Sequence, residues 1–397
     1  MNKYKPSKDM QGAAKLSVEA VEGVVSLIES AHSTILRFGG FLGDTEKPLT
    51  GISGFVYRMI RLVTRLVGFS IEKAFSSLTY VLKDTESSPN RDAVLSVVNG
   101  IFGDYLATKG NTLAIEMRLR VDGKPIGFSE LLERTTHKKK LLLMVHGLCM
   151  NDIQWNRKEH DHGKELSKSL NAVPVYLHYN SGKHISENGK QLSAILKELY
   201  SKLSNDIELS ILAHSMGGLV TRSALHYAQT LNHSWSKNLN KVIFLGTPHH
   251  GALLEKGGNW IDILLDSNPY TIPFSRIGKI RSSGITDLRH SFIVDEDWKD
   301  KDRFEFNSDS GRLIPLPEGM AFYAIAAVTS QKSNLIGNSI VGDGLVTLKS
   351  AFSDSKSLKQ NLNIHKDKQW VKYGINHMEL LNDKDVYQQI ESWLKVD

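Results

Sequence analysis

The chain has 397 residues, which is more than one ordinary domain needs, and its hydrophobic content of 41% suffices for a large core. A single cysteine, Cys149, excludes an internal disulfide, so nothing in the sequence requires an oxidising compartment. The net charge of +6 favours an acidic surface as a partner, but no basic and aromatic recognition motif accompanies it, so we expect no binding of nucleic acid.

The first 108 residues are predicted to form a helical region of their own, 1–108. Apolar residues recur at helical spacing over 10–38 and over 51–83, and a third, shorter segment covers 91–107. Three arginines interrupt the second run, which therefore falls short of the roughly 20 uncharged apolar residues of a transmembrane helix.

Two interpretations of the run over 51–83 remain open. It is either a helical hairpin that packs on the rest of the chain or on another subunit, or an interfacial helix. In the second case its apolar face enters lipid while Arg58, Arg61 and Arg65 meet anionic headgroups. The charged N-terminus lacks a following apolar stretch, so we expect no signal peptide and a cytoplasmic location, with membrane association and oligomeric state left open.

A β-hairpin is predicted to open the second region, 109–397. Apolar residues alternate with polar or small ones from Leu113 to Val121, and Asp122-Gly123 then gives a turn. The apolar run over 141–145 is typical of a buried strand, and His146-Gly147-Leu148 follows it. Because glycine allows close approach of the backbone, this loop can present the Leu148 N–H to a reacting oxygen.

The next apolar strand, 207–212, ends in a tight turn around Ser215 that leads into a helical pattern over 219–225. The residues two positions before and two positions after the serine, Ala213 and Gly217, are both small. So sharp a turn leaves no room for larger side chains there. The start of the helix supplies a positive dipole end and free N–H groups, including that of Met216. The pattern indicates a serine nucleophile that the turn lifts out of the backbone; a plain Ser-Gly turn between a strand and a helix is the alternative.

A turn rich in glycine and proline, Gly246–Gly251, follows the next predicted strand. Its histidines His249 and His250 have no acidic residue at metal-ligand spacing, so we expect a structural role for the pair and no metal ion. Residues 252–319 are irregular in pattern. We predict a cap that covers Ser215, with an insertion packed away from the site as the alternative.

Two further polar residues follow strand patterns near the C-terminus. The apolar run over 320–327 leads to a Gly-Asp-Gly turn that presents Asp343, and the short strand pattern over 369–374 precedes His377 and a final helix. A neutral imidazole can take the proton of a serine, and a carboxylate can fix its tautomer. The acids at 295–297 lie in a charged loop and are weaker candidates.

These motifs, in this order, resemble the lipase branch of the α/β-hydrolases. The nearest groups are the bacterial triacylglycerol lipases and the lipase-like domain of glycosylphosphatidylinositol inositol-deacylases. The resemblance covers about residues 110–397. Its motifs are His146-Gly147-Leu148, the turn at 213–218 with Ala213 in place of the usual first glycine, Leu245–Gly251, Gly342–Val346 and Asn376-His377.

The resemblance implies an α/β-hydrolase fold with a mostly parallel central sheet and a cap insertion over about 252–319. In this fold the acid and the histidine follow the serine in chain order, so the triad would be Ser215, Asp343 and His377. Two backbone N–H groups form the oxyanion hole of such enzymes. They are expected here from the two loops described above, at Leu148 and Met216.

The expected activity is cleavage of a carboxylic ester, of a lipid or another acyl substrate, through an acyl-enzyme and without a cofactor. A thioesterase or an intracellular polyester depolymerase with the same triad is an alternative, and so is a non-catalytic hydrolase-fold protein that binds a membrane or a partner. In some calcium-dependent lipases that the chain resembles, an acid follows the catalytic histidine by two positions, as Glu379 does. One carboxylate does not define a calcium site. The residues expected to line the substrate site are His146, Gly147, His214 and His249.

Overall fold

The computed structural model of the chain describes residues 89–204, 206–251, 282–299, 312, 314–331, 342–354 and 361–396, all of which fall in one compact unit. The predicted helices over 10–38 and 51–83, and the part of the predicted cap over 252–281, lie outside the described residues. The division of the chain at residue 108, the membrane contact and the cap therefore stay predictions.

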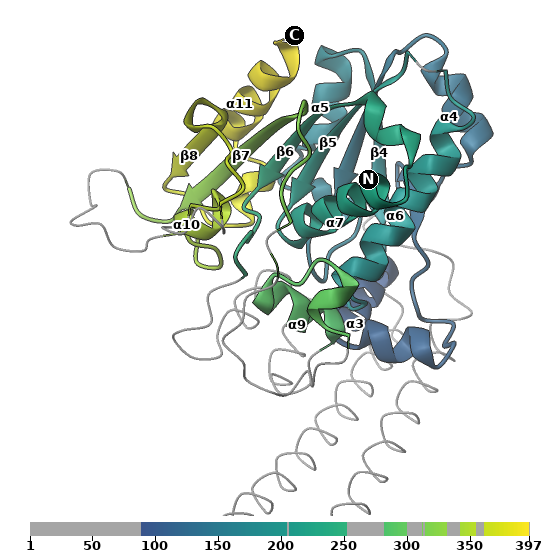
Figure 1. Cartoon of the computed structure of the whole chain (residues 1–397). Coiled ribbons are helices and arrows are strands. Elements are labelled where there is room, and N and C mark those ends of the chain that lie inside the picture. The colour runs from purple at the N-terminus through teal and green to yellow at the C-terminus, as the bar shows by residue number, and fades with distance from the viewer. Residues whose placement is uncertain are drawn as a thin grey trace, which may run out of the picture. The chain divides into compact units, whose positions relative to one another are not determined.

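An eight-stranded sheet forms the centre of the unit, with the strand order β2-β1-β4-β3-β5-β6-β7-β8 (Figure 1). The six strands from β3 to β8 run parallel to one another, and β1 is antiparallel to both β2 and β4. This mostly parallel sheet with helices on both faces confirms the predicted α/β-hydrolase fold. The strands are β1 (Arg118–Val121), β2 (Lys124–Pro125), β3 (Lys140–Val145), β4 (Ala172–His178), β5 (Glu208–His214), β6 (Leu239–Leu245), β7 (Ala321–Val328) and β8 (Gln369–Tyr373).

Helices cover both faces of the sheet. Figure 1 shows α6 and α7 on one face and α5 and α11 on the other. The α-helices are α3 (Pro89–Thr108), α4 (Phe128–Thr135), α5 (His162–Ser169), α6 (Ile185–Tyr200), α7 (Met216–Thr230), α9 (Ser283–His290), α10 (Leu348–Ala351) and α11 (Lys384–Lys395). The 3-10 helices are η1 (Ile153–Trp155), η2 (Ser234–Asn238), η4 (Asp295–Asp297), η7 (Lys366–Lys368) and η8 (Glu379–Leu381).

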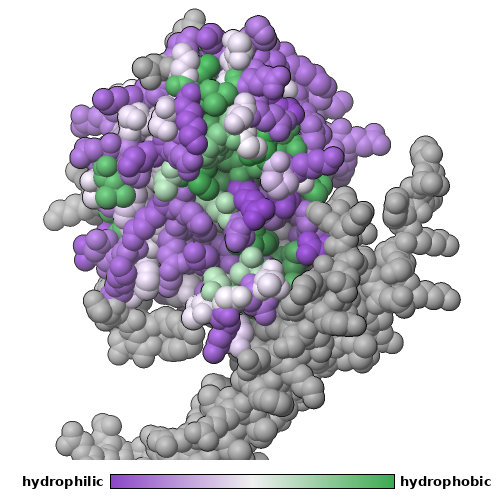
Figure 2. Space-filling view, turned by 90° about the vertical axis from the view of Figure 1, so that its right-hand side faces the viewer, coloured by the Kyte–Doolittle hydropathy of each residue, from purple (hydrophilic) through white to green (hydrophobic). Residues whose placement is uncertain are grey.

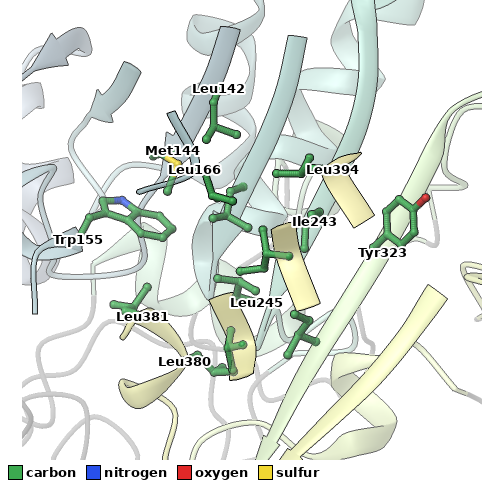
Figure 3. Packing of buried hydrophobic residues seen from close by; sticks show 14 of the residues in the cluster. Leu142, Met144, Trp155, Leu166, Ile243, Leu245, Tyr323, Leu380, Leu381 and Leu394 are labelled. Atoms are coloured by element: carbon green, nitrogen blue, oxygen red, sulfur yellow. The ribbon is translucent and has the colours of Figure 1, made fainter. Parts of the chain in front are cut away.

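The central strands β3, β5, β6 and β7 are mostly apolar on both faces because helices bury each face. In β3, Leu142 and Met144 point toward α5 and α11, whereas the alternate residues of the strand point to the opposite face. Figure 3 shows the cluster on the α5 and α11 side, to which Leu166 of α5 and Leu394 of α11 contribute. This core fixes the carboxyl edge of the sheet, from which the loops after β3, β5 and β6 extend.

The predicted hairpin is present, but its first strand is shorter than the alternating pattern suggests. The β1 strand begins only at Arg118, although the pattern extends back to Leu113. The reason is a competing partner. The Asn99 side chain of α3 donates to the Leu113 carbonyl at 2.8 Å and accepts the Ile115 N–H at 2.9 Å, so this segment bonds to α3 instead of the sheet.

The surface of the described unit is mostly polar. Figure 2 shows charged and polar side chains over most of the face it presents, with apolar residues gathered in a limited central area. Leu231 and Val396 are the large apolar residues that stand well exposed within the described ranges. In those same ranges, no helix combines the length and the apolar content needed to span a bilayer.

Replacing Leu166 tests the core. The Leu166→Ala variant should lose about 2–5 kcal/mol of unfolding free energy, because the fully buried side chain leaves a cavity between α5 and the sheet. The same substitution at the 55% exposed Leu231 is the matched control and should change the unfolding free energy by less than about 0.5 kcal/mol. Urea unfolding of the full chain measures both, and equal losses would contradict the core described here.

Candidate active site

Ser215 occupies the single residue between the end of β5 and the start of α7. Its backbone has φ 54° and ψ −126°, a conformation that an L-residue adopts at a cost of about 1–3 kcal/mol. The Ser215 N–H donates to the Leu245 carbonyl at the end of β6, over 2.8 Å. The predicted strand-to-helix turn is therefore present, and it lifts the serine from the carboxyl edge of the sheet.

Close backbone approach explains the small residues around this turn. A β-carbon at Gly217 would overlap the Val145 carbonyl oxygen, and one at Gly218 would overlap the Thr247 side chain. A β-carbon at Gly147 would lie 3.0 Å from the Ser215 β-carbon. The glycines let the loops after β3 and β6 close around the serine.

Asp343 and His377 form a buried pair. The His377 Nδ1 lies 2.6 Å from Asp343 Oδ2, and the two residues are 2% and 3% exposed. The other carboxylate oxygen accepts the N–H groups of Leu345 and Val346 at 2.9 and 2.8 Å, so the acid is held in one orientation. Because the carboxylate accepts, Nδ1 carries the proton and Nε2 is left with a free lone pair.

The histidine loop is packed against the serine turn. The His214 Nε2 lies 3.3 Å from the His377 carbonyl oxygen, and the two rings have centroids 4.7 Å apart. A β-carbon at Gly246 would lie 2.9 Å from His377 Cε1, so only glycine leaves room for the ring here. Within the described residues His377 Nε2 has no hydrogen-bond partner. The structure thus gathers the three predicted triad residues at the carboxyl edge of the sheet.

The loop after β3 is held by aromatic and polar contacts. The His146 Nδ1 lies 2.9 Å from the Gly147 carbonyl oxygen, and its ring stacks on Tyr179 with centroids 4.4 Å apart. The Tyr179 hydroxyl donates to the His146 carbonyl at 2.8 Å. Leu148 is buried beyond this glycine, and Met216 is the first residue of α7, where helix N–H groups have no acceptor within the helix.

Three histidines expected to contact substrate are buried and uncharged at neutral pH. Burial lowers the pKa of His146 to about 3. The pKa of His214 lies well below its usual value because of burial and the nearby His377. The pKa of His249 is also far below its usual value, through burial and the adjacent Arg222 guanidinium. None of the three rings readily accepts a proton at neutral pH. That these histidines and Gly147 contact substrate stays a prediction.

The Gly246–Gly251 turn is anchored by protein contacts. The His249 Nδ1 lies 3.5 Å from Arg222 Nη1, and the His250 Nε2 lies 3.0 Å from the Ser353 hydroxyl. Glu379 accepts the N–H of Asn376, the residue before His377, at 3.0 Å. In the described ranges, no group of three or more metal-ligating side chains comes together.

The competing acids have other partners. Asp295 accepts hydrogen bonds from Lys190, Lys299 and the Tyr227 hydroxyl. Asp297 accepts backbone N–H groups, including that of Ile293 at 2.9 Å. Neither carboxylate reaches His377, and Asp343 does.

Sequence reasoning missed the residues that support the site from behind. Tyr179 clamps the loop after β3, and the Ser181 hydroxyl accepts the Cys149 N–H at 3.1 Å. Trp155 packs its ring edge-on against His214, with centroids 6.4 Å apart. One signal for the first two was available in the sequence, because the polar residues at 178–182 lie at the carboxyl end of the mostly apolar stretch 173–177.

Comparison with known proteins adds likenesses of fold. A family model described as a domain of unknown function (DUF7379) matches residues 124–276, and no curated protein matches the chain. The crystal structure of Bacillus licheniformis lipase BlEst2 in its mature form is similar at 18% identity and TM-score 0.41, over 64% of this chain and 92% of that chain.

Two further solved structures illustrate the range. Aspergillus fumigatus lipase B is similar at 13% identity and TM-score 0.38, over 70% of this chain and 56% of that chain. The RedJ thioesterase from the prodiginine biosynthetic pathway of Streptomyces coelicolor is similar at 10% identity and TM-score 0.38, over 65% of this chain and 85% of that chain.

The buried histidines predict a loss of stability in acid. The pKa values of His146 and His162 are lowered by burial from 6.5 to about 3 in the folded chain. The unfolded chain therefore binds these protons first, and the stability that both neutral rings contribute above pH 6.5 is lost as the pH falls toward 3. Each ring should contribute a slope of about 1.4 kcal/mol per pH unit between these values.

Urea unfolding at pH 7, 6 and 5 measures this slope. His162→Gln removes one titrating group and should make the slope shallower by about 1.4 kcal/mol per pH unit. An unchanged slope in this variant would contradict the assignment.

Proposed function

We propose that the chain is a serine hydrolase that cleaves carboxylic esters of lipids or other acyl compounds through an acyl-enzyme. The observation that carries the proposal is the buried Asp343–His377 pair, with an unpartnered Nε2, beside a serine in a strained strand-to-helix turn. A serine with a merely structural role would not require this strained conformation, and among the described histidines His377 is the one whose other ring nitrogen faces Asp343.

The reaction divides the work among three residues. The Ser215 hydroxyl oxygen attacks the ester carbonyl carbon while its proton passes to His377 Nε2. The imidazolium then gives that proton to the departing alkoxide oxygen, and the alcohol leaves an acyl group on the serine. Water attacks the acyl group in the same way, and the carboxylic acid is released. Asp343 keeps the proton on Nδ1 and stabilises the imidazolium in both steps.

The negative charge on the carbonyl oxygen needs its own donors. The N–H of Met216 begins α7 beside the serine, and the N–H of Leu148 follows the glycine that touches Ser215. Both are backbone donors on loops that tight packing holds in place, so little reorganisation accompanies the reaction. One such donor contributes about 10²- to 10³-fold to kcat in comparable sites.

The first test replaces the nucleophile. Ser215→Ala should abolish hydrolysis of p-nitrophenyl acyl esters and labelling by a fluorophosphonate probe, because no other group takes the acyl chain. Ser201→Ala, at an exposed serine at the end of α6, is the matched control and should keep full activity. A wild-type chain that neither labels nor hydrolyses any ester would refute the proposal. A preference for thioesters over oxygen esters in the same series would instead identify a thioesterase.

The second test weakens the acid. Asp343→Asn retains the shape of the side chain but its amide cannot stabilise an imidazolium, so kcat should fall on the order of 10⁴-fold with little change in KM. Steady-state kinetics on the same esters measure the effect, and the urea midpoint shows whether the fold survives. A loss below tenfold would mean that another acid supports His377.

A further inference from the structure

One face of α3 contacts three loops that surround the candidate site. Asn99 and Gly103 are four positions apart, as are Gly100 and Asp104, and Gly100 and Gly103 are three apart, so these residues lie along one side of the helix. Figure 1 shows α3 and α9 next to each other below the sheet, where these loops emerge. The helix therefore forms part of the wall behind the reaction centre, although it precedes the whole sheet in the chain.

The loop after β3 meets α3 at Gly100, with no room for a side chain between them. A β-carbon at Gly100 would overlap the Cys149 sulfur and would lie 3.1 Å from both the Cys149 Cα and N atoms. Cys149 itself has φ 58°, a left-handed conformation that costs energy for any residue with a side chain. It directly follows Leu148, the proposed donor to the oxyanion. The helix backbone and the donor loop are thus in direct contact.

The other two loops tie α3 in place. The Asn180 side chain, after β4, donates to the Gly103 carbonyl at 2.9 Å. At the start of α9, the Ser282 hydroxyl donates to the Gly100 carbonyl at 2.6 Å, and the Ser283 N–H and hydroxyl both donate to Asp104 at 2.9 Å. These hydrogen bonds from the loop after β4 and from the start of α9 hold the α3 backbone around Gly100 in place. Cys149, which packs against Gly100, therefore has little freedom to shift.

We propose that Gly100 is a positioning residue for the oxyanion hole: α3 presses on Cys149 and thereby sets the direction of the Leu148 N–H. This inference rests on the proposed function. The Leu148 peptide lies between Gly147, fixed against Ser215, and Cys149, fixed between Gly100 and the Ser181 hydroxyl. A donor displaced by about 1 Å can cost 10²-fold in rate. The helix thus acts on the transition state without touching substrate.

Gly100→Ala tests the role directly. The added methyl group displaces Cys149, so kcat should fall about tenfold or more while KM stays within about twofold, since the donor acts mainly in the transition state. A thionoester, whose sulfur accepts hydrogen bonds poorly, should react equally slowly with variant and wild type. The rate ratio of the oxygen ester to the thionoester should therefore fall with kcat.

A double variant traces the effect to its route. In Cys149→Ala the sulfur that the new methyl group meets is gone, so adding Gly100→Ala should cost far less kcat than it does in the wild-type background. Gly189→Ala is the control for crowding alone, because a β-carbon there would overlap the Ser223 hydroxyl between α6 and α7. Where Gly189→Ala lowers the urea midpoint as much as Gly100→Ala does, it should still leave the rate ratio of oxygen ester to thionoester unchanged.

Ser181→Ala gives a second test if Gly100→Ala does not fold. It removes the acceptor of the Cys149 N–H and leaves α3 intact, and it should lower kcat selectively in the same way. Wild-type kcat in folded Gly100→Ala, or in Ser181→Ala should the first variant not fold, would overturn the positioning role and leave the proposed function standing. An equal kcat loss from Gly100→Ala with and without Cys149 would also overturn it. A wild-type chain without esterase activity would overturn the proposed function itself.

Discussion

The geometry of the site depends on how closely three backbones approach one another at the Ser215 turn. The start of α7 passes within contact of the end of β3 at Gly217, and the turn after β6 is in contact at Gly218. The Ser215 N–H is bonded to the Leu245 carbonyl at the same place. Interiors are close-packed, so none of these elements can shift alone. The contacts at this turn therefore determine where the loops after β3 and β6 lie.

Charge is controlled around the serine mainly by burial. His146 and His214 are uncharged because a protonated ring would lose its hydration without gaining a carboxylate partner. The neutrality of His214 matters for His377, since a positive ring 4.7 Å away would oppose a positive charge on His377 in the proposed reaction. Asp343 is the acid that faces His377, and its second oxygen is already satisfied by backbone N–H groups. The Asp343–His377 pair therefore has an uncharged ring, that of His214, packed against it.

Local patterns predict much of the fold and of the triad geometry, because buried strands are short apolar runs and a sharp turn demands small residues. The strand before Ser215, and those before Asp343 and His377, lie within one or two residues of their predicted bounds. Contacts between distant segments carry no such signal. The shortening of β1 depends on Asn99, and the wall formed by Gly100 depends on three loops that only tertiary structure brings to one helix. The catalytic roles themselves remain predictions.

The one thiol of the chain can report when the loop after β3 separates from α3. Cys149 is 4% exposed, and burial raises its pKa to about 12, so in the closed state an alkylating reagent finds neither access nor thiolate. Alkylation must wait until the loop separates from α3 and solvent enters. If the loop closes faster than the exposed thiol reacts with excess reagent, the alkylation rate is proportional to the population of the open state. It then gives the free energy of that local opening. The chain thus carries a built-in reporter of motion beside its proposed oxyanion hole, with no label engineered into it.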